Sequence, residues 1–164
     1  MVDSMDSAPR EETLAYLGAH NSMTLATVGE DGPWAAGVFY VNRGFTLYFL
    51  SDPNSRHCVS LARSPRVAAA IHEDYFDWRD IKGIQLEGVA SAVTGRWEQA
   101  QALAAYLAKF PYVASFLGRP LRLSKMEIGG KKVSVKLYRV APEHIYFLDN
   151  SKGFSHRDEL FPIK

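Results

Sequence analysis

A short segment of the chain brings together three kinds of group that bind phosphate. Ser51 ends a strand-like run, a three-residue turn follows, and a helix begins at Ser55, Arg56 and His57. The N-terminus of a helix presents free backbone N–H groups and the positive end of the helix dipole, which favour an anion. An arginine can hold the same anion through two parallel hydrogen bonds. The segment predicts a site for a phosphorylated ligand; the alternative is an ordinary capped surface helix with solvated side chains.

Two further polar groups could reach the same ligand from a neighbouring strand. Lys82 precedes, and Gln85 lies within, an alternating polar and apolar segment at residues 83–88. Alternation of this kind is typical of a half-buried strand. If that strand lies beside the helix start, both side chains point toward the ligand; the alternative is an ordinary polar face.

The C-terminal segment is unusually rich in groups that could bind a flat, polar molecule. Phe154 could stack on a flat ring of the ligand. Asn150, Lys152 and His156 could hydrogen-bond to the polar edges of that ring. The ends of a chain normally carry a less varied set of side chains than this. The segment therefore predicts a contribution to a binding cleft, with a solvated tail as the alternative.

Other kinds of chemistry find no support in the sequence. It contains neither of the glycine-rich phosphate loops, GxxxxGK[ST] and GxGxxG, and no GxSxG nucleophile motif. No HExxH or His-x-His spacing supports a metal site. No catalytic side chain is identified, so we expect any redox chemistry to come from a cofactor.

Composition places the chain among ordinary globular proteins. Of 164 residues, 47% are hydrophobic and 23% charged, and 19 basic against 18 acidic residues give a formal charge of +1. Such a balance favours neither a nucleic acid nor a membrane surface as partner. The single cysteine, Cys58, fits a reducing compartment. No apolar run approaches the roughly 20 residues of a membrane span, so we expect a cytoplasmic protein.

Hydrophobic periodicity predicts a mainly β protein of the α+β class. Period-two segments joined by short glycine turns indicate strands at residues 23–28, 34–41, 45–50, 66–72, 83–94, 132–140 and 144–148. Helices are expected near 9–18, 55–63 and 97–110, with a turn at 141–143 before the last strand. We expect a small antiparallel split β-barrel with helices packed on its rim. Its domain would cover residues 9–148, after a disordered 1–8 and before a C-terminal tail at 149–164.

Together these segments resemble the pyridoxamine 5'-phosphate oxidase-like FMN-binding split-barrel family. The resemblance lies in LATVGEDGPWAAGVFYV, LYFLSDPNSRHCVSLARSPRVAAAI and KGIQLEGVA, in that order. The closing YFLDNSKGFSHRDE resembles a subgroup of flavin-reductase-like or uncharacterised members rather than the oxidase itself.

The resemblance implies a homodimer that holds two FMN molecules in clefts between its subunits. It places Ser51, Ser55, Arg56 and His57 around the FMN phosphate. It also implies that Lys82 and Gln85 touch the ribityl chain or ring, and that residues 150–156 of the partner subunit close over the flavin. The backbone beside the isoalloxazine ring would be that of Ala36, Gly37, Val38 and Phe39.

Two departures from the family pattern limit what the resemblance implies. Many members carry a lysine where this chain has His57, and the ring-lining strand lacks the arginine and lysine of the oxidase proper. Flavin binding is therefore better supported than oxidation of pyridoxamine phosphate. We expect an FMN-dependent oxidoreductase acting on a small substrate; the alternative is a non-catalytic flavin- or haem-binding module that carries electrons, stores the cofactor or acts as a sensor. Because family members also bind haem or a deazaflavin, these remain the other candidate cofactors.

Overall fold

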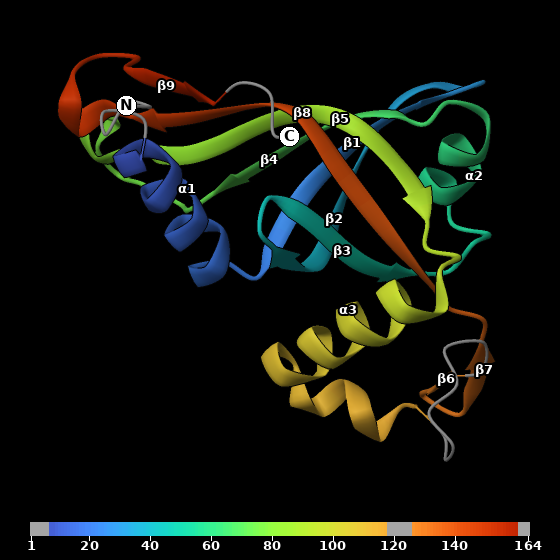
Figure 1. The fold of residues 1–164 in the computed structure, drawn as a ribbon. Helices are drawn as coiled ribbons and strands as arrows, with labels where there is room; N and C mark the ends of the chain where they lie inside the picture. The colour runs from blue at the N-terminus through green and yellow to red at the C-terminus, as the bar shows by residue number, and fades with distance from the viewer. Residues whose placement is uncertain (1–6, 118–125, 161–164) are drawn as a thin grey trace.

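An antiparallel β-barrel forms the centre of the protein (Figure 1). The computed structural model describes residues 7–117 and 126–160, to which all structural statements refer. Six strands close the barrel in the order β3-β2-β1-β4-β5-β8, because β8 also pairs with β3, and β9 adds to the free edge of β8. The strands are β1 (Ser22–Gly29), β2 (Gly32–Arg43), β3 (Thr46–Ser51), β4 (Arg66–His72), β5 (Lys82–Ala92), β8 (Lys136–Asp149) and β9 (Arg157–Leu160).

The period of two in the sequence separates the two faces of these strands. In β1, Met23, Leu25 and Thr27 are buried, while the residues between them are exposed. The buried rows of all the barrel strands meet in one core, which includes Leu47, Phe49, Ile84, Val140 and Phe147. The predicted fold class, a mainly β split barrel with helices, is therefore confirmed.

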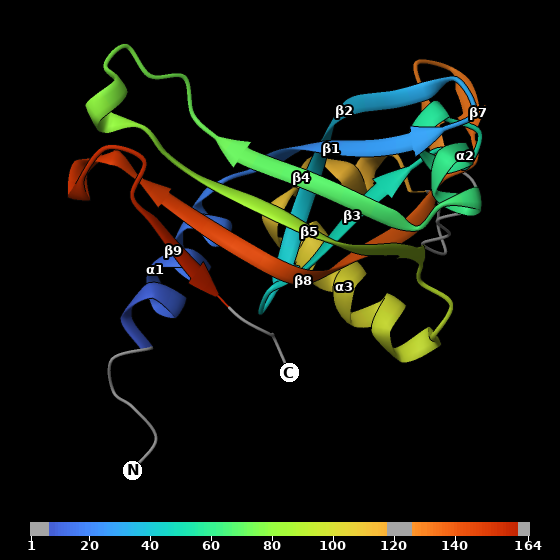
Figure 2. The same ribbon diagram turned by 90° about the horizontal axis from the view of Figure 1, so that it is seen from above.

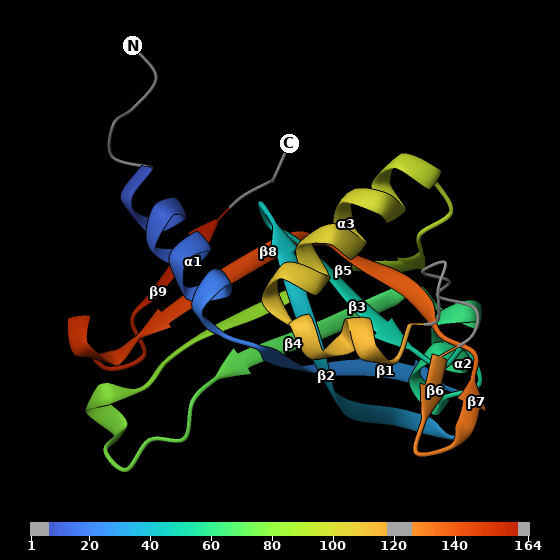
Figure 3. The ribbon, with the colours of Figure 1, turned by 90° about the horizontal axis from the view of Figure 1, so that it is seen from below.

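Three helices pack around the barrel. In α1 (Ser7–Ala19), Leu17 enters the barrel core; in α2 (Arg56–Arg63), Cys58 and Leu61 do so. α3 (Arg96–Lys109) and the 3₁₀ segment η2 (Pro111–Ser115) lie across the outer side of β2 and β3 (Figure 3). There they bury a second apolar cluster, formed by Val41, Tyr48, Val93, Ala102, Tyr106, Phe110, Val113, Leu117, Val135 and Leu137.

The predicted turn at residues 141–143 is wrong, because β8 runs without a break from Lys136 to Asp149. Pro142 lies at a bulge in β8, where the single step from Glu87 to Gly88 in β5 is matched by two steps in β8, from His144 to Pro142. A bulge of this kind tolerates a residue that has no N–H to give to the ladder. A Cβ atom added to Gly88 would lie 2.2 Å from the carbonyl oxygen of Ala141, so only glycine fits.

Residues 132–135, expected at the start of that strand, lie outside β8. Lys131–Val133 forms β7, which pairs with β6 (Met126–Ile128) in a separate two-stranded sheet. Ser7 and Ala8, expected to be disordered, belong to α1, and residues 1–6 lie outside the described part. None of the helices in the described ranges is both long and apolar enough to cross a membrane.

The segment after residue 148 is joined to the barrel sheet. β9 pairs with β8 from Leu148 to Ile145, and Leu160 is buried in the core; residues 161–164 lie outside the described part. The 3₁₀ turn η3 (Asn150–Lys152) lies between β8 and β9. An ion pair with a buried carboxylate fixes its start: the Lys82 Nζ lies 3.2 Å from the Asp149 Oδ2, and Asp149 is only 1% exposed. This ion pair joins the beginning of β5 to the end of β8.

The Asp149 carboxylate has a pKa below its ordinary value. Burial alone would raise this pKa, but hydrogen bonds from Ser151 and from Lys82 outweigh burial and stabilise the charged form. A carboxyl with a lowered pKa in the folded state stabilises the fold above about pH 4. That contribution disappears as the pH falls through the lowered pKa.

We predict that Asp149→Asn lowers the free energy of unfolding by about 2 kcal/mol near neutral pH, the scale of a charge-assisted hydrogen bond. Urea denaturation at two pH values measures the effect. The gap to wild type should narrow below about pH 4, where both proteins lack the charge. Asp80→Asn, at an exposed position, is the matched control and should change little. Equal stability of Asp149→Asn and wild type near neutral pH would contradict the role of the ion pair.

Candidate functional site

A cluster of two hydroxyls and one imidazole forms where β3 ends and α2 begins. The Ser51 Oγ lies 2.7 Å from the His57 Nε2 and 3.3 Å from the Ser55 Oγ. The Ser55 Oγ is 3.1 Å from the same imidazole nitrogen. Three of the four residues predicted to bind phosphate are thus within hydrogen-bond distance of one another; we call Ser51, Ser55 and His57 the hydroxyl–imidazole cluster.

The start of α2 leaves its first-turn N–H groups without a side-chain cap. Ser55 occupies the N-cap position but makes no side-chain hydrogen bond to the helix. Its hydroxyl donates instead to the Asp52 carbonyl oxygen at 2.7 Å. Uncapped N–H groups at a helix start are the donors that hold an anion. The cluster and the helix start therefore present donors at the same place.

The neighbours of the buried Cys58 thiol lower its pKa. The thiol is buried, and burial by itself raises its pKa, yet the net pKa is lowered. Hydrogen bonds to His57, Ser55, Tyr138 and Ser51 cause the reduction. Groups that stabilise a thiolate stabilise other anions too.

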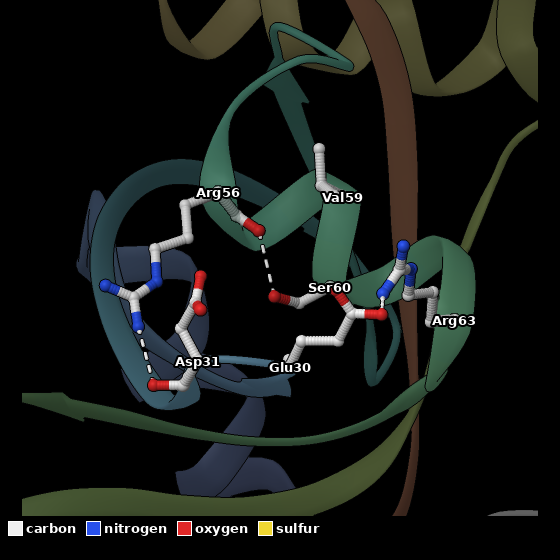
Figure 4. Close-up of a pocket in the computed structure, with 7 residues that line it drawn as sticks. Glu30, Asp31, Arg56, Val59, Ser60 and Arg63 are labelled. Atoms are coloured by element: carbon white, nitrogen blue, oxygen red, sulfur yellow. Dashed lines mark hydrogen bonds and ion pairs between the residues drawn. The ribbon is translucent and has the colours of Figure 1, made fainter.

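Arg56, the fourth predicted phosphate ligand, lies apart from the cluster. Its guanidinium is stacked 4.4 Å from the Trp34 ring centre. It also donates to the Asp31 carbonyl oxygen at 3.2 Å (Figure 4). It borders a small cavity of about 170 Å³ between α2 and the β1–β2 turn. In that cavity Arg63 is paired with Glu30, so its charge is already balanced. The sequence placed Arg56 next to His57, but their side chains leave the helix in different directions.

The residues predicted to run beside a flavin ring, Ala36, Gly37, Val38 and Phe39, lie in the middle of β2. Gly37 is exposed, and Phe39 is 52% exposed. Phe39 borders an apolar cavity of about 300 Å³ between β3, α3 and β7. Ser51 borders it too, so this cavity adjoins the hydroxyl–imidazole cluster. The cavity is lined by Phe39, Leu50, Ser51, Asp52, Tyr106, Tyr112, Val113, Phe116, Val133 and Val135.

Sequence reasoning missed most residues of this aromatic cavity. Tyr106, Tyr112 and Phe116 come from α3 and the 3₁₀ segment that follows it. In the sequence they read as the apolar stripe of an amphipathic helix, which normally marks core packing. The excess of aromatic residues in YLAKFPYVASF was the available signal.

Lys82 and Gln85 lie on another part of the barrel surface. Both border a cavity of about 210 Å³ together with Ala70, His72 and Ile81. Lys82 is held by Asp149, whereas the exposed Gln85 makes no such contact. The prediction that these two residues share a site with the hydroxyl–imidazole cluster therefore has no support within one chain.

Most polar side chains of the C-terminal segment hold the segment itself in place. Asn150 donates from its Nδ2 to the Trp78 carbonyl oxygen at 2.7 Å and accepts from the Ser155 N–H at 3.0 Å. Lys152 lies 2.8 Å from the Glu12 carboxylate, and His156 lies 3.2 Å from the Asp158 carboxylate.

Phe154 is the tail residue that is free to meet a ligand. It is 81% exposed and makes an edge contact with Trp78 at 5.5 Å between ring centres. Trp78, at 53% exposure, was not singled out from the sequence. It lies in the predicted loop after β4, which the fold brings beside the C-terminal turn.

The two halves of the predicted site lie at opposite ends of the barrel. Figure 2 shows α2 at one end of the sheet and the β8–β9 turn at the other. The hydroxyl–imidazole cluster belongs to the first end, and Phe154 with Trp78 to the second. One chain therefore cannot bring all fourteen predicted residues to one ligand.

Within one chain, the arrangement supports binding better than side-chain catalysis. It joins anion-binding donors to an aromatic cavity, which suits a phosphorylated molecule with a flat apolar part. In the described part of the chain, no group of three or more His, Cys, Asp and Glu side chains is arranged to hold a metal.

Comparison with known proteins identifies the family. The sequence matches the family described as pyridoxamine 5'-phosphate oxidase over residues 9–149. It is 28% identical over 152 residues to a UPF0306 protein of Klebsiella pneumoniae (strain 342), which covers 89% of this chain and 91% of the relative.

Two solved structures share the fold. A haem binding protein from Mycobacterium smegmatis has a TM-score of 0.73 and 22% identity over 94% of this chain, which spans 58% of that protein's length. HutZ, a haem storage protein from Vibrio cholerae, has a TM-score of 0.64 and 21% identity, covering 81% of this chain and 89% of its own.

The resemblance read from the residues is thus confirmed. The sequence match extends through the barrel, from α1 to the end of β8. The protein belongs to the pyridoxamine 5'-phosphate oxidase family.

Proposed function

We propose that the protein is a homodimeric flavoprotein that binds FMN and uses it as an oxidoreductase on a small substrate. The observation that carries the proposal is the hydroxyl–imidazole cluster beside the uncapped start of α2. Hydroxyl, imidazole and free N–H groups are suitable donors for the oxygens of the FMN phosphate. Family membership favours FMN over other phosphorylated molecules.

The residues around the cluster also fit the rest of the cofactor. Ser51 belongs both to the cluster and to the lining of the aromatic cavity. A ligand whose phosphate binds at the cluster could therefore place apolar parts against Phe39 and its neighbours. FMN supplies hydride chemistry when bound, while the protein supplies orientation and exclusion of water. The aromatic lining of the cavity suits the exclusion of water.

A homodimer would complete the site. The outward face of β2, β1 and β4 carries two rows of small side chains: Ala35, Ala26 and Ala68 lie opposite one another, as do Gly37, Thr24 and Ala70. Beside these rows, on the same face as Ala26, Val28 is 58% exposed. An exposed face of small side chains allows close contact with another protein surface.

We propose that a second copy of the chain covers this face through a two-fold axis. Such an axis makes the same patch of both copies meet. Because α2 and the β8–β9 turn lie at opposite ends of the barrel, the axis would bring Phe154 and Trp78 of one copy toward α2 of the other. The C-terminal residues would then serve the cofactor bound by the other subunit.

Haem binding is the second candidate function. Two structures of the same fold belong to a haem binding protein and a haem storage protein. Haem needs an axial ligand, commonly a histidine. Among the histidines of this chain, His72 is exposed and borders the cavity that contains Gln85, so it is the histidine placed to act as that ligand.

We predict that His57→Ala weakens FMN binding roughly ten- to a hundredfold, the effect of losing one hydrogen bond to a charged group. Riboflavin, which lacks the phosphate, should bind both proteins alike. Quenching of flavin fluorescence on titration measures both affinities. His72→Ala is the matched control and should bind FMN as the wild type does. Absence of any FMN binding by the wild type would overturn the proposed function.

The haem candidate is tested with the same two variants. Titration with haemin, followed by its visible absorption, should show tight binding that His72→Ala loses and His57→Ala keeps, if haem is the cofactor. Haemin binding that is weak and equal in all three proteins would exclude this candidate.

We predict that Ala26→Glu separates the dimer. The substitution places an unpaired carboxylate at the centre of the small-residue face, and two of them would lie close together across the axis. Light scattering after gel filtration measures the mass. Ala104→Glu, on the exposed side of α3, is the matched control and should remain dimeric. The proposed interface would be wrong if Ala26→Glu kept the dimer mass.

A further inference from the structure

The pairing of β3 with β8 places a lysine beside the hydroxyl–imidazole cluster. In this antiparallel pair Ser51 lies directly opposite Lys136, as Phe49 lies opposite Tyr138. Opposite residues of an antiparallel pair point to the same side of the sheet, with Cβ atoms roughly 5 Å apart. The side chain of Lys136 therefore leaves β8 on the side that carries the Ser51 hydroxyl.

The preceding pair in the same row shows which way this side faces. The rings of Phe49 and Tyr138 are stacked at 5.2 Å, and Tyr138 is hydrogen-bonded to Cys58 in the first turn of α2. The row thus faces the start of α2. Lys136, two residues before Tyr138, continues it at the open end of the barrel.

The hydroxyl–imidazole cluster itself lacks a permanent positive charge. Two of its three groups are neutral hydroxyls, and the neighbouring Arg56 guanidinium is engaged with Trp34 and Asp31. Lys136 is exposed, and none of the ion pairs among the described residues involves it. A lysine stem is long and flexible enough to bring its ammonium to an anion held by the residue opposite.

We propose that Lys136 is the cation that binds the phosphate of the ligand at the hydroxyl–imidazole cluster. The inference rests on the proposed function, since it adds a residue to the same site. It also assigns a specificity: Lys136 makes the site prefer a phosphorylated flavin to the same flavin without its phosphate. The contribution is electrostatic, so it weakens as salt screens the charges.

Lys136→Met removes the charge and keeps an unbranched stem, which makes it the direct test. We expect FMN affinity to fall roughly tenfold, as for the loss of one charge-assisted contact, with riboflavin affinity unchanged. Lys136→Arg should retain most of the FMN affinity. Arg43→Met, which removes one exposed positive charge at the end of β2, opposite the first residue of β3, is the control and should bind both flavins as the wild type does.

Titrations at low and high salt complete the test. The FMN affinity of the wild type should depend on salt more steeply than that of Lys136→Met. Equal FMN affinity of wild type and Lys136→Met would overturn the inference and leave the proposed function standing. An equal loss of FMN and riboflavin affinity would also overturn it, because the effect would not pass through the phosphate. A wild type that binds neither flavin would overturn both proposals.

Discussion

The pairing of β3 with β8 is the interaction on which the rest of the structure depends. These strands are more than 80 residues apart in the chain, and their pairing closes the barrel. Closure buries Leu47, Phe49 and Val140 on the inside. It also fixes the open end of the barrel, where β3 stops at Ser51 and α2 begins. A closed barrel leaves no edge between these strands, so the end of β3 has a fixed position.

That fixed end gives the proposed site its chemistry. The strand end, the turn and the helix start hold Ser51, Ser55 and His57 within hydrogen-bond distance, while the outer layer of α3 supplies the aromatic cavity next to them. The same rigid barrel separates this end from Phe154 and Trp78. Its length thus makes a second copy necessary if the C-terminal residues are to serve the ligand, and the small-residue face is the surface on which that copy would lie.

Much of the fold could be predicted from the sequence because its signals are local. Alternation in residues 23–28 and 66–72, glycine turns and the helix before Pro111 depend on near neighbours, and the structure has strands and helices there. Pro142 misled the prediction, since a proline in a strand is tolerated only through Gly88, which is 54 residues earlier and not visible as its partner. The hydroxyl–imidazole cluster could also be predicted from the sequence, because its three residues lie within one segment of seven residues.

The rest of the site could not be predicted from the sequence. It depends on the directions in which side chains point and on contacts between residues far apart in the chain. Nothing local shows that Arg56 turns toward Trp34 while His57 turns toward Ser51. The aromatic cavity joins β2, β3, α3 and β7, and its residues resemble ordinary core residues when read one helix at a time. Lys136 becomes relevant only when the register places it opposite Ser51.

The central claim is that FMN binds to a dimer of this chain. Analytical ultracentrifugation of the protein with added FMN, recorded at the visible absorbance of the flavin, tests it most directly. We expect the flavin to sediment with a species of twice the 18.3 kDa chain mass, one flavin for each chain. Flavin that stays at the top of the cell while the protein sediments, or a flavin-bound species with the mass of one chain, would contradict it.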